Sequence, residues 1–201
     1  MRLALVIACC AACSLGGKQP SYQYYVLTSR PASPAAPHVE PGAASRALAV
    51  DEVKIPGYLD REQIATRTAG QRLLYSTTDR WAEPLDQAVE RTLLEDLAVL
   101  LIPHGIQVTS HDGRATYELS VDVLRFERNG ADRVELWARW VLRSEGRVLD
   151  RDELRVQLPM SSDDSNAMAA ALSEAVARMA TQVGDRVQKA DVVAARGRPD
   201  R

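Results

Sequence analysis

Cysteine occurs only within the first thirteen residues of this 201-residue chain, at Cys9, Cys10 and Cys13. A thiol can serve as a nucleophile, bind zinc, form a disulfide or carry a lipid. Because no cysteine follows Cys13, the body of the chain has no thiol for catalysis, for a cysteine-based zinc site or for an internal disulfide framework. The remaining role for these three cysteines is covalent modification close to the N-terminus, such as attachment of a lipid.

The residues around these cysteines have the pattern of a secretory signal. Arg2 supplies a positive charge, and residues 3–8 form an apolar run far shorter than the ~20 residues of a membrane-spanning helix. Ala11 and Ala12 precede Cys13, and a bacterial lipobox likewise has small residues before the cysteine that receives a diacylglyceryl group. The pattern predicts a signal peptide over 1–12 and lipid attachment at Cys13.

Two alternatives remain open for this segment. Cys9 follows Val6-Ile7-Ala8, which fits a lipobox better locally but leaves a very short apolar region. A plain secretory signal with unmodified cysteines is the other alternative.

The residue after Cys13 is Ser14 rather than Asp, which is typical of lipoproteins sorted to the outer membrane.

Three histidines and two polar runs are the remaining groups that could do chemistry. His38, His104 and His111 lack the spacing of metal ligands, and the chain has no H-E-x-x-H, G-x-S-x-G, G-x-G-x-x-G or P-loop motif. Residues 150–153 combine three carboxylates with an arginine, which is typical of a solvated strand edge because neighbours point to opposite faces. Residues 161–165 lack the spaced ligands of a calcium-binding EF-hand loop. The sequence predicts no enzyme activity, no metal and no cofactor.

The composition is that of an ordinary globular protein. Hydrophobic residues make up 46% and charged residues 26%, with a formal net charge of −2. This excludes a disordered chain, a collagen-like repeat and a polytopic membrane protein. The balanced charge also argues against nucleic acid as a partner, which requires a basic surface.

The N-terminal half of the body contains strands separated by a proline-rich loop. Tyr and Val enrichment predicts a strand over 22–28, and its apolar residues on both faces favour a central position in a sheet. Four prolines predict a loop over 31–45. A second strand is expected over 47–55, and residues 64–68 and 72–76 are expected to form a hairpin.

Two segments have the apolar spacing of amphipathic helices. The first helix is predicted over about 84–101, because Pro84 suits a first helical turn and Gly105 suits a helix end. The second is predicted over about 164–189, followed by a flexible tail over 190–201. The two apolar stripes comprise Leu85, Val89, Leu93, Leu97 and Leu100 in the first helix, and Met168, Leu172, Val176, Met179, Val183 and Val187 in the second.

Residues 117–158 have the alternation of a β-meander. Apolar and polar residues alternate from Tyr117, and the alternation changes phase near Leu124, which indicates a bulge. Asn129-Gly130 predicts a type I′ turn, and residues 144–147 predict another turn. Trp137 and Trp140 lie three residues apart in one strand, so they should occupy opposite faces and one should be less buried.

These elements predict one α+β domain over 22–189, with a mixed or largely antiparallel sheet packed by the two helices. An anchor and spacer over 13–21 would precede it. A short strand over 106–108 completes the set of expected elements.

Four short motifs occur in order within this body: Tyr24-Tyr25-Val26-Leu27, Ile55-Pro56-Gly57-Tyr58-Leu59-Asp60-Arg61, Gln63-Ile64-Ala65-Thr66-Arg67 and Arg80-Trp81-Ala82-Glu83-Pro84-Leu85. Together with the lipobox, this ordered set resembles the ABC-type transport auxiliary lipoprotein family over roughly residues 13–190. The resemblance weakens in the C-terminal half, where it lies in the pattern more than in the residues.

The resemblance implies an outer-membrane lipoprotein of a Gram-negative bacterium, with its body in the periplasm. Family members work with periplasmic MCE-domain proteins and with ABC permeases and ATPases that move lipids or hydrophobic compounds. The implied role is a non-catalytic adaptor that docks the MCE component, and the resemblance leaves homo-oligomerisation open.

Three residues are expected to contact the partner. Tyr58 and Leu59 follow a Pro-Gly turn, where an exposed aromatic–apolar pair at a loop tip would dock a partner. The alternative is that Tyr58 folds back onto the sheet. Trp137 is the third, on the strand face opposite Trp140.

A second function from another class remains open. The protein could itself bind a lipid or hydrophobic solute in a groove between the sheet and the helices. Such a site needs a wide, apolar and incompletely filled lining. The small residues of the second predicted helix would leave room for one, although alanine also packs closely.

Overall fold

The computed structural model describes residues 21–30, 46–68 and 71–196. The proline-rich segment 31–45, Cys9 and Cys13 lie outside the described residues. The elements are β1 (Gln23–Tyr25), β2 (Arg46–Lys54), β3 (Gln63–Arg67), β4 (Leu73–Trp81), α1 (Leu85–Leu101), a 3-10 turn (Ile102–His104), β5 (Ile106–Ser110), β6 (Tyr117–Asn129), β7 (Arg133–Ser144), β8 (Arg147–Pro159) and α2 (Ser165–Arg196).

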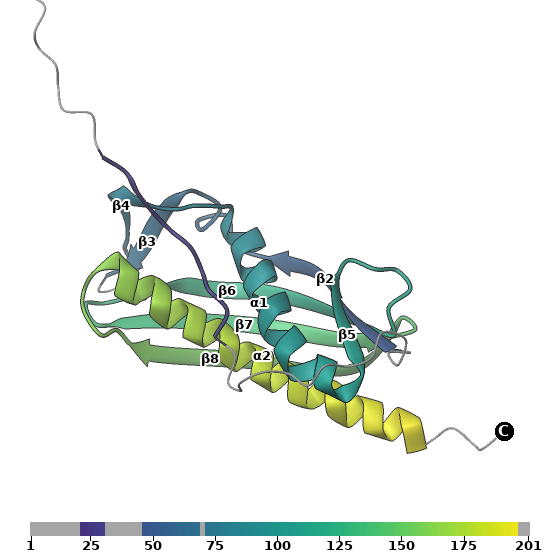
Figure 1. The fold of residues 1–201 in the computed structure, drawn as a ribbon. Helices are drawn as coiled ribbons and strands as arrows, with labels where there is room; N and C mark the ends of the chain where they lie inside the picture. The colour runs from purple at the N-terminus through teal and green to yellow at the C-terminus, as the bar shows by residue number, and fades with distance from the viewer. Residues whose placement is uncertain (1–20, 31–45, 69–70, 197–201) are drawn as a thin grey trace, which may run out of the picture.

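The eight described strands form one mixed sheet that forks at β6 (Figure 1). β7 pairs with one edge of β6, and β8 pairs with β7, both antiparallel. The other edge of β6 is shared: β2 pairs with its first half and β3 with its last two residues, both parallel. β5 extends the β2 branch, while β4 and then β1 extend the β3 branch. The predicted α+β class with a mixed sheet is confirmed.

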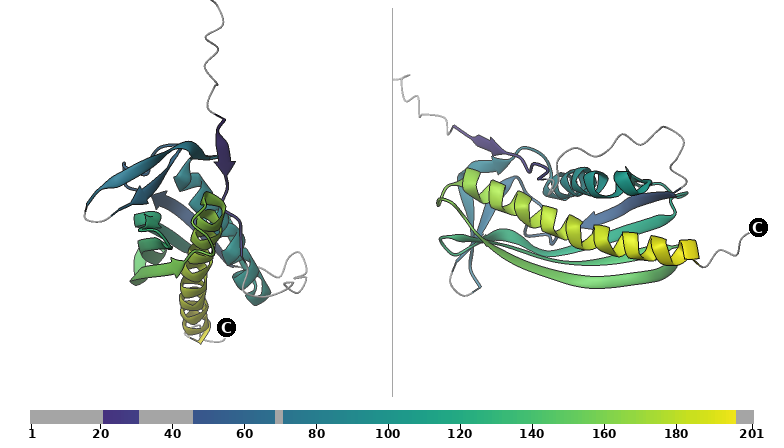
Figure 2. Two further views of the ribbon diagram at one scale, coloured as in Figure 1. Left: turned by 90° about the vertical axis from the view of Figure 1, so that its left-hand side faces the viewer. Right: turned by 60° about the horizontal axis from the view of Figure 1, so that its bottom comes forward.

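Both helices cover the same face of this sheet (Figure 2). α1 packs over β2 and β5, α2 packs over β7 and β8, and the helices pack against each other. Gly184 of α2 lies at this contact, where an added Cβ atom would be 3.4 Å from Leu100 Cδ1 of α1, about van der Waals distance. The predicted apolar stripes form the core with the inner face of the meander, where Leu136 and Trp140 are buried.

The meander has the predicted bulge but a different first turn. The pairing of β6 with β7 shifts between Val123 and Arg125, which confirms the bulge. Asn129 pairs with Arg133, so three residues form the loop, and positive φ occurs at Gly130 but not at Asn129. The predicted type I′ turn at Asn129-Gly130 is therefore wrong. The reason is tertiary: Asn129 also pairs with β3, and Gly130 donates its N–H to the Arg67 carbonyl.

The second turn of the meander has positive φ at two consecutive residues, whereas the first has it at Gly130 but not at Asn129. Glu145 and Gly146 have φ of 49° and 73°, between the paired residues Ser144 and Arg147. Positive φ at both central positions is what a two-residue type I′ hairpin requires. This turn confirms the one predicted over 144–147.

The C-terminal end of α2 differs from the prediction. The helix continues to Arg196, so residues 190–196 are helical rather than a flexible tail. Asp191 explains the extension: it is 8% exposed, accepts a hydrogen bond from the Tyr117 hydroxyl at 3.0 Å and forms an ion pair with Arg46. Both partners come from distant strands, so local sequence carries no sign of them.

β1 also differs from the prediction. Among the described strands it pairs with β4 alone and is an edge strand, not the central strand that its apolar residues on both faces favour. Tyr22, Tyr24 and Val26 are consequently exposed by 44%, 61% and 49%.

Candidate functional site

The outer face of β6, β7 and β8, which points away from both helices, carries the exposed side of the meander. Trp137 lies at its centre, between Arg125 of β6 and Arg155 of β8, which are its register partners. The guanidinium carbons of these arginines lie 5.5 Å and 5.2 Å from the centre of the Trp137 ring, within the range of cation–π contact. We call this group, together with Glu127 and Glu135, the Trp137 face.

Glu135 holds the two arginines in place. Its fully buried carboxylate accepts hydrogen bonds from Arg125 Nη1 at 3.1 Å, Arg155 Nε at 2.7 Å and Asn129 Nδ2 at 3.0 Å. Burial alone would raise the pKa of Glu135, but the bonds and charges of Arg155 and Arg125 outweigh it and lower the pKa. The carboxylate is therefore ionised at neutral pH and fixes the arginines beside the indole ring.

A second buried carboxylate lies directly across the strand pair. Glu127 is the register partner of Glu135 and is 1% exposed. It accepts hydrogen bonds from Arg67 Nε at 2.6 Å, the Tyr58 hydroxyl at 2.8 Å and the Phe126 N–H at 3.0 Å. Two carboxylates side by side repel each other. Arg67 of β3, together with Arg125 and Arg155 of the Trp137 face, supplies the compensating charge.

Tyr58 is part of this network and is not a free loop residue. Its hydroxyl donates to Glu127 and its ring lies 5.7 Å from the guanidinium carbon of Arg67. Burial, followed by the bond to Glu127, raises the pKa of Tyr58 well above its ordinary value. Tyr58 therefore folds back onto the sheet, which is the alternative that the sequence had left open.

Leu59 is also not where the sequence suggested. We expected an exposed Tyr58–Leu59 pair at a loop tip, but Leu59 is 3% exposed and belongs to the core. The Leu59 N–H donates to the Pro56 carbonyl at 2.8 Å, so the Pro-Gly turn directs the chain back toward the sheet. The expected exposure of Leu59 is therefore wrong.

Trp137 has the predicted placement. Trp140 is 1% exposed on the inner face, whereas Trp137 is half-buried on the outer face. The structure thus brings Tyr58 and Trp137 to the same face of the sheet, through the paired Glu127 and Glu135, and leaves Leu59 inside.

Sequence reasoning missed Glu127, Glu135, Arg67, Arg125 and Arg155. The available signal was weak: each glutamate lies in an otherwise apolar-alternating strand close to the Asn129-Gly130 turn. Hairpin pairing then brings two such residues opposite each other. Arg67 comes from β3, far away in the sequence, and nothing local indicates it.

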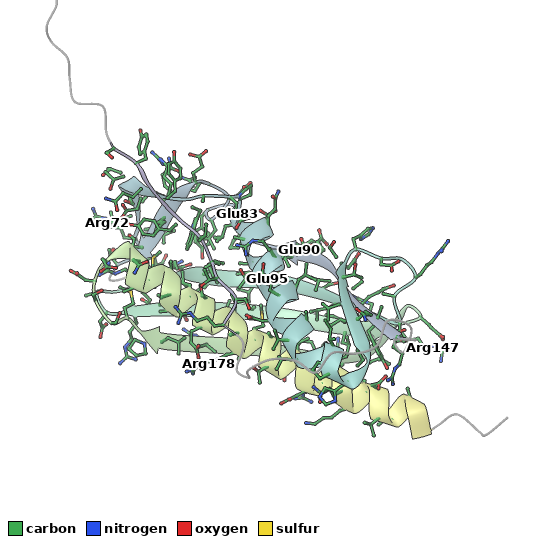
Figure 3. All side chains as sticks on the ribbon, in the orientation of Figure 1. Arg72, Glu83, Glu90, Glu95, Arg147 and Arg178 are labelled. Carbon is green, nitrogen blue, oxygen red and sulfur yellow. The ribbon has the colours of Figure 1, made fainter. Side chains whose placement is uncertain are left out.

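A groove beside residues 26–29 is a candidate solute pocket within the described part of the chain. It has a volume of about 660 Å³ and is lined by Val26 and Leu27 and by the Glu83–Arg91–Glu95 ion-pair cluster. Arg91 Nη2 also donates to the Leu27 carbonyl at 3.0 Å. Figure 3 shows Glu83 and Glu95 along the same side of the molecule, next to α1. Apolar surface predominates in the lining, but the groove is open to solvent and is crossed by an ion-pair cluster, unlike an enclosed carrier pocket.

Other site types find no support in the described part of the chain. Within those residues, no cluster of three or more His, Cys, Asp or Glu side chains could hold a metal ion. His111 Nδ1 lies 2.8 Å from Asp51 Oδ1 on an exposed edge. Of the helices within the described ranges, none is both long and apolar enough to cross a membrane.

Comparison with known proteins identifies relatives over most of the chain. Residues 25–184 match the family described as ABC-type transport auxiliary lipoprotein component. The intermembrane transport lipoprotein PqiC of Escherichia coli K12 is 24% identical over 145 residues, which is 72% of this chain and 76% of PqiC, and PqiC of Shigella flexneri matches equally.

Two crystal structures share the fold. One, of an uncharacterized protein, has a TM-score of 0.71 at 23% identity and covers 83% of this chain and 99% of its own. The other, protein XCC0632 from Xanthomonas campestris, has a TM-score of 0.67 at 23% identity and covers 84% and 98%. At this identity the likeness concerns the architecture alone.

Proposed function

This chain belongs to the ABC-type transport auxiliary lipoprotein component family, and from that membership we propose that it is the adaptor of a lipid-transport system. In this proposal it docks a periplasmic MCE-domain protein, which works with an ABC permease and ATPase. The match over residues 25–184 carries the proposal, and the likeness to an intermembrane transport lipoprotein supports a role in transport between membranes. The family is one of transport components rather than enzymes, and we assign the chain no catalytic step.

The Trp137 face is the proposed docking surface. Trp and Arg are the residues most enriched among those that dominate binding energy, and Trp137 is a half-exposed indole held between two arginines. The side chains are positioned before binding, because buried Glu135 fixes both arginines on a sheet. Binding therefore costs little side-chain ordering.

We expect Trp137→Ser to weaken capture of the MCE-domain protein by about 1–3 kcal/mol, the usual effect of truncating a dominant contact residue. That corresponds to roughly 5- to 150-fold in Kd. Titration of the purified MCE-domain protein against wild type and variant measures the change, and the melting temperature is recorded alongside.

Two variants control this measurement. Trp137→Phe keeps an aromatic ring between the arginines and should retain most of the affinity. Val148→Ser, at a residue of β8 that is 52% exposed, should change neither affinity nor melting temperature. Unchanged affinity in Trp137→Ser would place the docking surface elsewhere.

We further propose that Cys13 carries the lipid, with Cys9 as the alternative, after removal of residues 1–12. Residues 13–21 then act as anchor and spacer of an outer-membrane protein whose body faces the periplasm. The Ala11-Ala12-Cys13 sequence and the lipoprotein family support this assignment.

Mass spectrometry of the mature protein is expected to find a diacylated Cys13 as the first residue. Cys13→Ser should release the protein from the membrane, because anchoring depends on the acyl chains. It should leave the melting temperature unchanged, because the core lies downstream. A mature chain that begins at another residue, or that carries no lipid, would contradict the assignment.

A further inference from the structure

We propose that Tyr22, Tyr24 and Arg80 form a membrane-contact surface that lies against a phospholipid bilayer; this inference rests on the lipid anchor of the proposed function. We call these three residues the tyrosine face. The surface lies at the edge of the β3 branch of the sheet, on β1 and the neighbouring β4.

The register of β1 and β4 places the three side chains together. Tyr24 is the register partner of Arg80, so both point to the same face of the sheet. The guanidinium carbon of Arg80 lies 4.2 Å from the centre of the Tyr22 ring. The opposite face of the same strand pair is directed inward, where Trp81 is 5% exposed.

The chemistry of this surface matches a phospholipid headgroup region. Tyrosine is enriched at membrane interfaces, because its ring is apolar and its hydroxyl remains hydrated. Arginine binds phosphate, and basic residues are attracted to anionic lipids. Within the described residues Arg80 forms no ion pair, so its charge is not neutralised by a carboxylate.

The position of the anchor brings this surface to the membrane. Nine peptide steps join Cys13 to Tyr22, and even a fully extended chain of that length reaches only about 30 Å. By comparison, the 32 residues of α2 span about 48 Å. β1 and the C-terminal end of α2 lie at opposite ends of the molecule (Figures 1 and 2). A short tether therefore holds the tyrosine face near the bilayer and favours the other end projecting away.

Tryptophan introduced at each end of the molecule tests this orientation. Lipidated protein is reconstituted into vesicles of phosphatidylethanolamine and phosphatidylglycerol, with or without brominated acyl chains that quench tryptophan emission. Tyr24→Trp reports on the tyrosine face. Val193→Trp, at an α2 residue that is 71% exposed, is the matched control at the far end. The three native tryptophans contribute the same background to both variants.

We expect the emission added by Tyr24→Trp to shift to shorter wavelength on reconstitution and to be lost in brominated vesicles. The emission added by Val193→Trp should do neither. Adding Tyr22→Ser and Arg80→Gln to Tyr24→Trp should reduce the quenching, because both contacts with the headgroups are removed.

Two outcomes would overturn the inference: equal quenching of the two variants, and no quenching at position 24 in protein that is bound to vesicles. Equal quenching of the two variants would mean that the body has no preferred orientation. A wavelength shift without quenching would mean that Tyr24 contacts protein, such as a second copy, rather than lipid. Vesicle flotation distinguishes these results from failure of the anchor. Protein that does not float with the vesicles lacks the lipid anchor. Protein that floats but shows no quenching at position 24 contradicts the proposed membrane contact and leaves the anchor assignment intact.

Discussion

Arg67→Met is expected to lower the free energy of unfolding by about 3–5 kcal/mol, the scale on which removal of one partner of a buried ion pair destabilises a protein. Arg67 is the only arginine bonded to Glu127 in the described part of the chain, through Nε to Oε1 at 2.6 Å. The Glu127 side chain is fully buried and that of Arg67 is 16% exposed. Methionine keeps the apolar part of the side chain but, among the described residues, leaves the buried carboxylate with Tyr58 and a backbone N–H as partners.

Urea unfolding of the wild type and of Arg67→Met measures the difference in unfolding free energy. The double variant Arg67→Met with Glu127→Gln should regain most of the stability, because it removes the unpaired charge together with its partner. Arg139→Met is the matched control: Arg139 pairs with Glu153 on the surface, where both side chains are about half exposed. A surface pair contributes about 1 kcal/mol or less. Equal effects of Arg67→Met and Arg139→Met would contradict burial of Glu127.

Leu59→Ala is expected to cost about 2–5 kcal/mol of unfolding free energy, the range for truncating a core leucine, since it leaves a cavity in addition to losing apolar burial. Leu59 is 3% exposed and belongs to the core cluster, although it follows a Pro-Gly turn. Leu74→Ala is the matched control, because Leu74 lies on β4 and is 44% exposed. If Leu59→Ala lowered the unfolding free energy as little as Leu74→Ala does, Leu59 would be an exposed loop residue rather than a core residue.

Together, Leu59→Ala and Trp137→Ser distinguish a core residue from a docking residue. In Leu59→Ala, any loss of MCE capture should follow the fraction of folded protein. In Trp137→Ser, capture should fall while most of the protein remains folded. The sequence placed both residues in one class, and only their burial separates them.

Elements defined by local periodicity were predicted well. α1 begins at Leu85 and ends at Leu101, close to the expected 84–101, because its apolar stripe and the flanking Pro84 and Gly105 are all local signals. The meander, its bulge and the inner position of Trp140 follow from the period of two along a strand. Each of these features depends on residues close together in the chain.

Features that depend on distant residues were not predicted. α2 extends past Lys189 because Asp191 meets Tyr117 and Arg46, and Leu59 is buried because its turn folds back toward the sheet. β1 is an edge strand because nothing but β4 pairs with it among the described strands. In each case burial is decided by an element that lies far away in sequence.

The candidate site shows the same division. The alternation of β7 was enough to place Trp137 on the face opposite Trp140. The buried pair of Glu127 and Glu135 required the strand register, and its stability required an arginine from β3. Burying a carboxylate is costly unless hydrogen-bond donors or opposite charge reach it. Those donors are supplied by the tertiary structure, so no local pattern in the sequence indicates where such a carboxylate will lie.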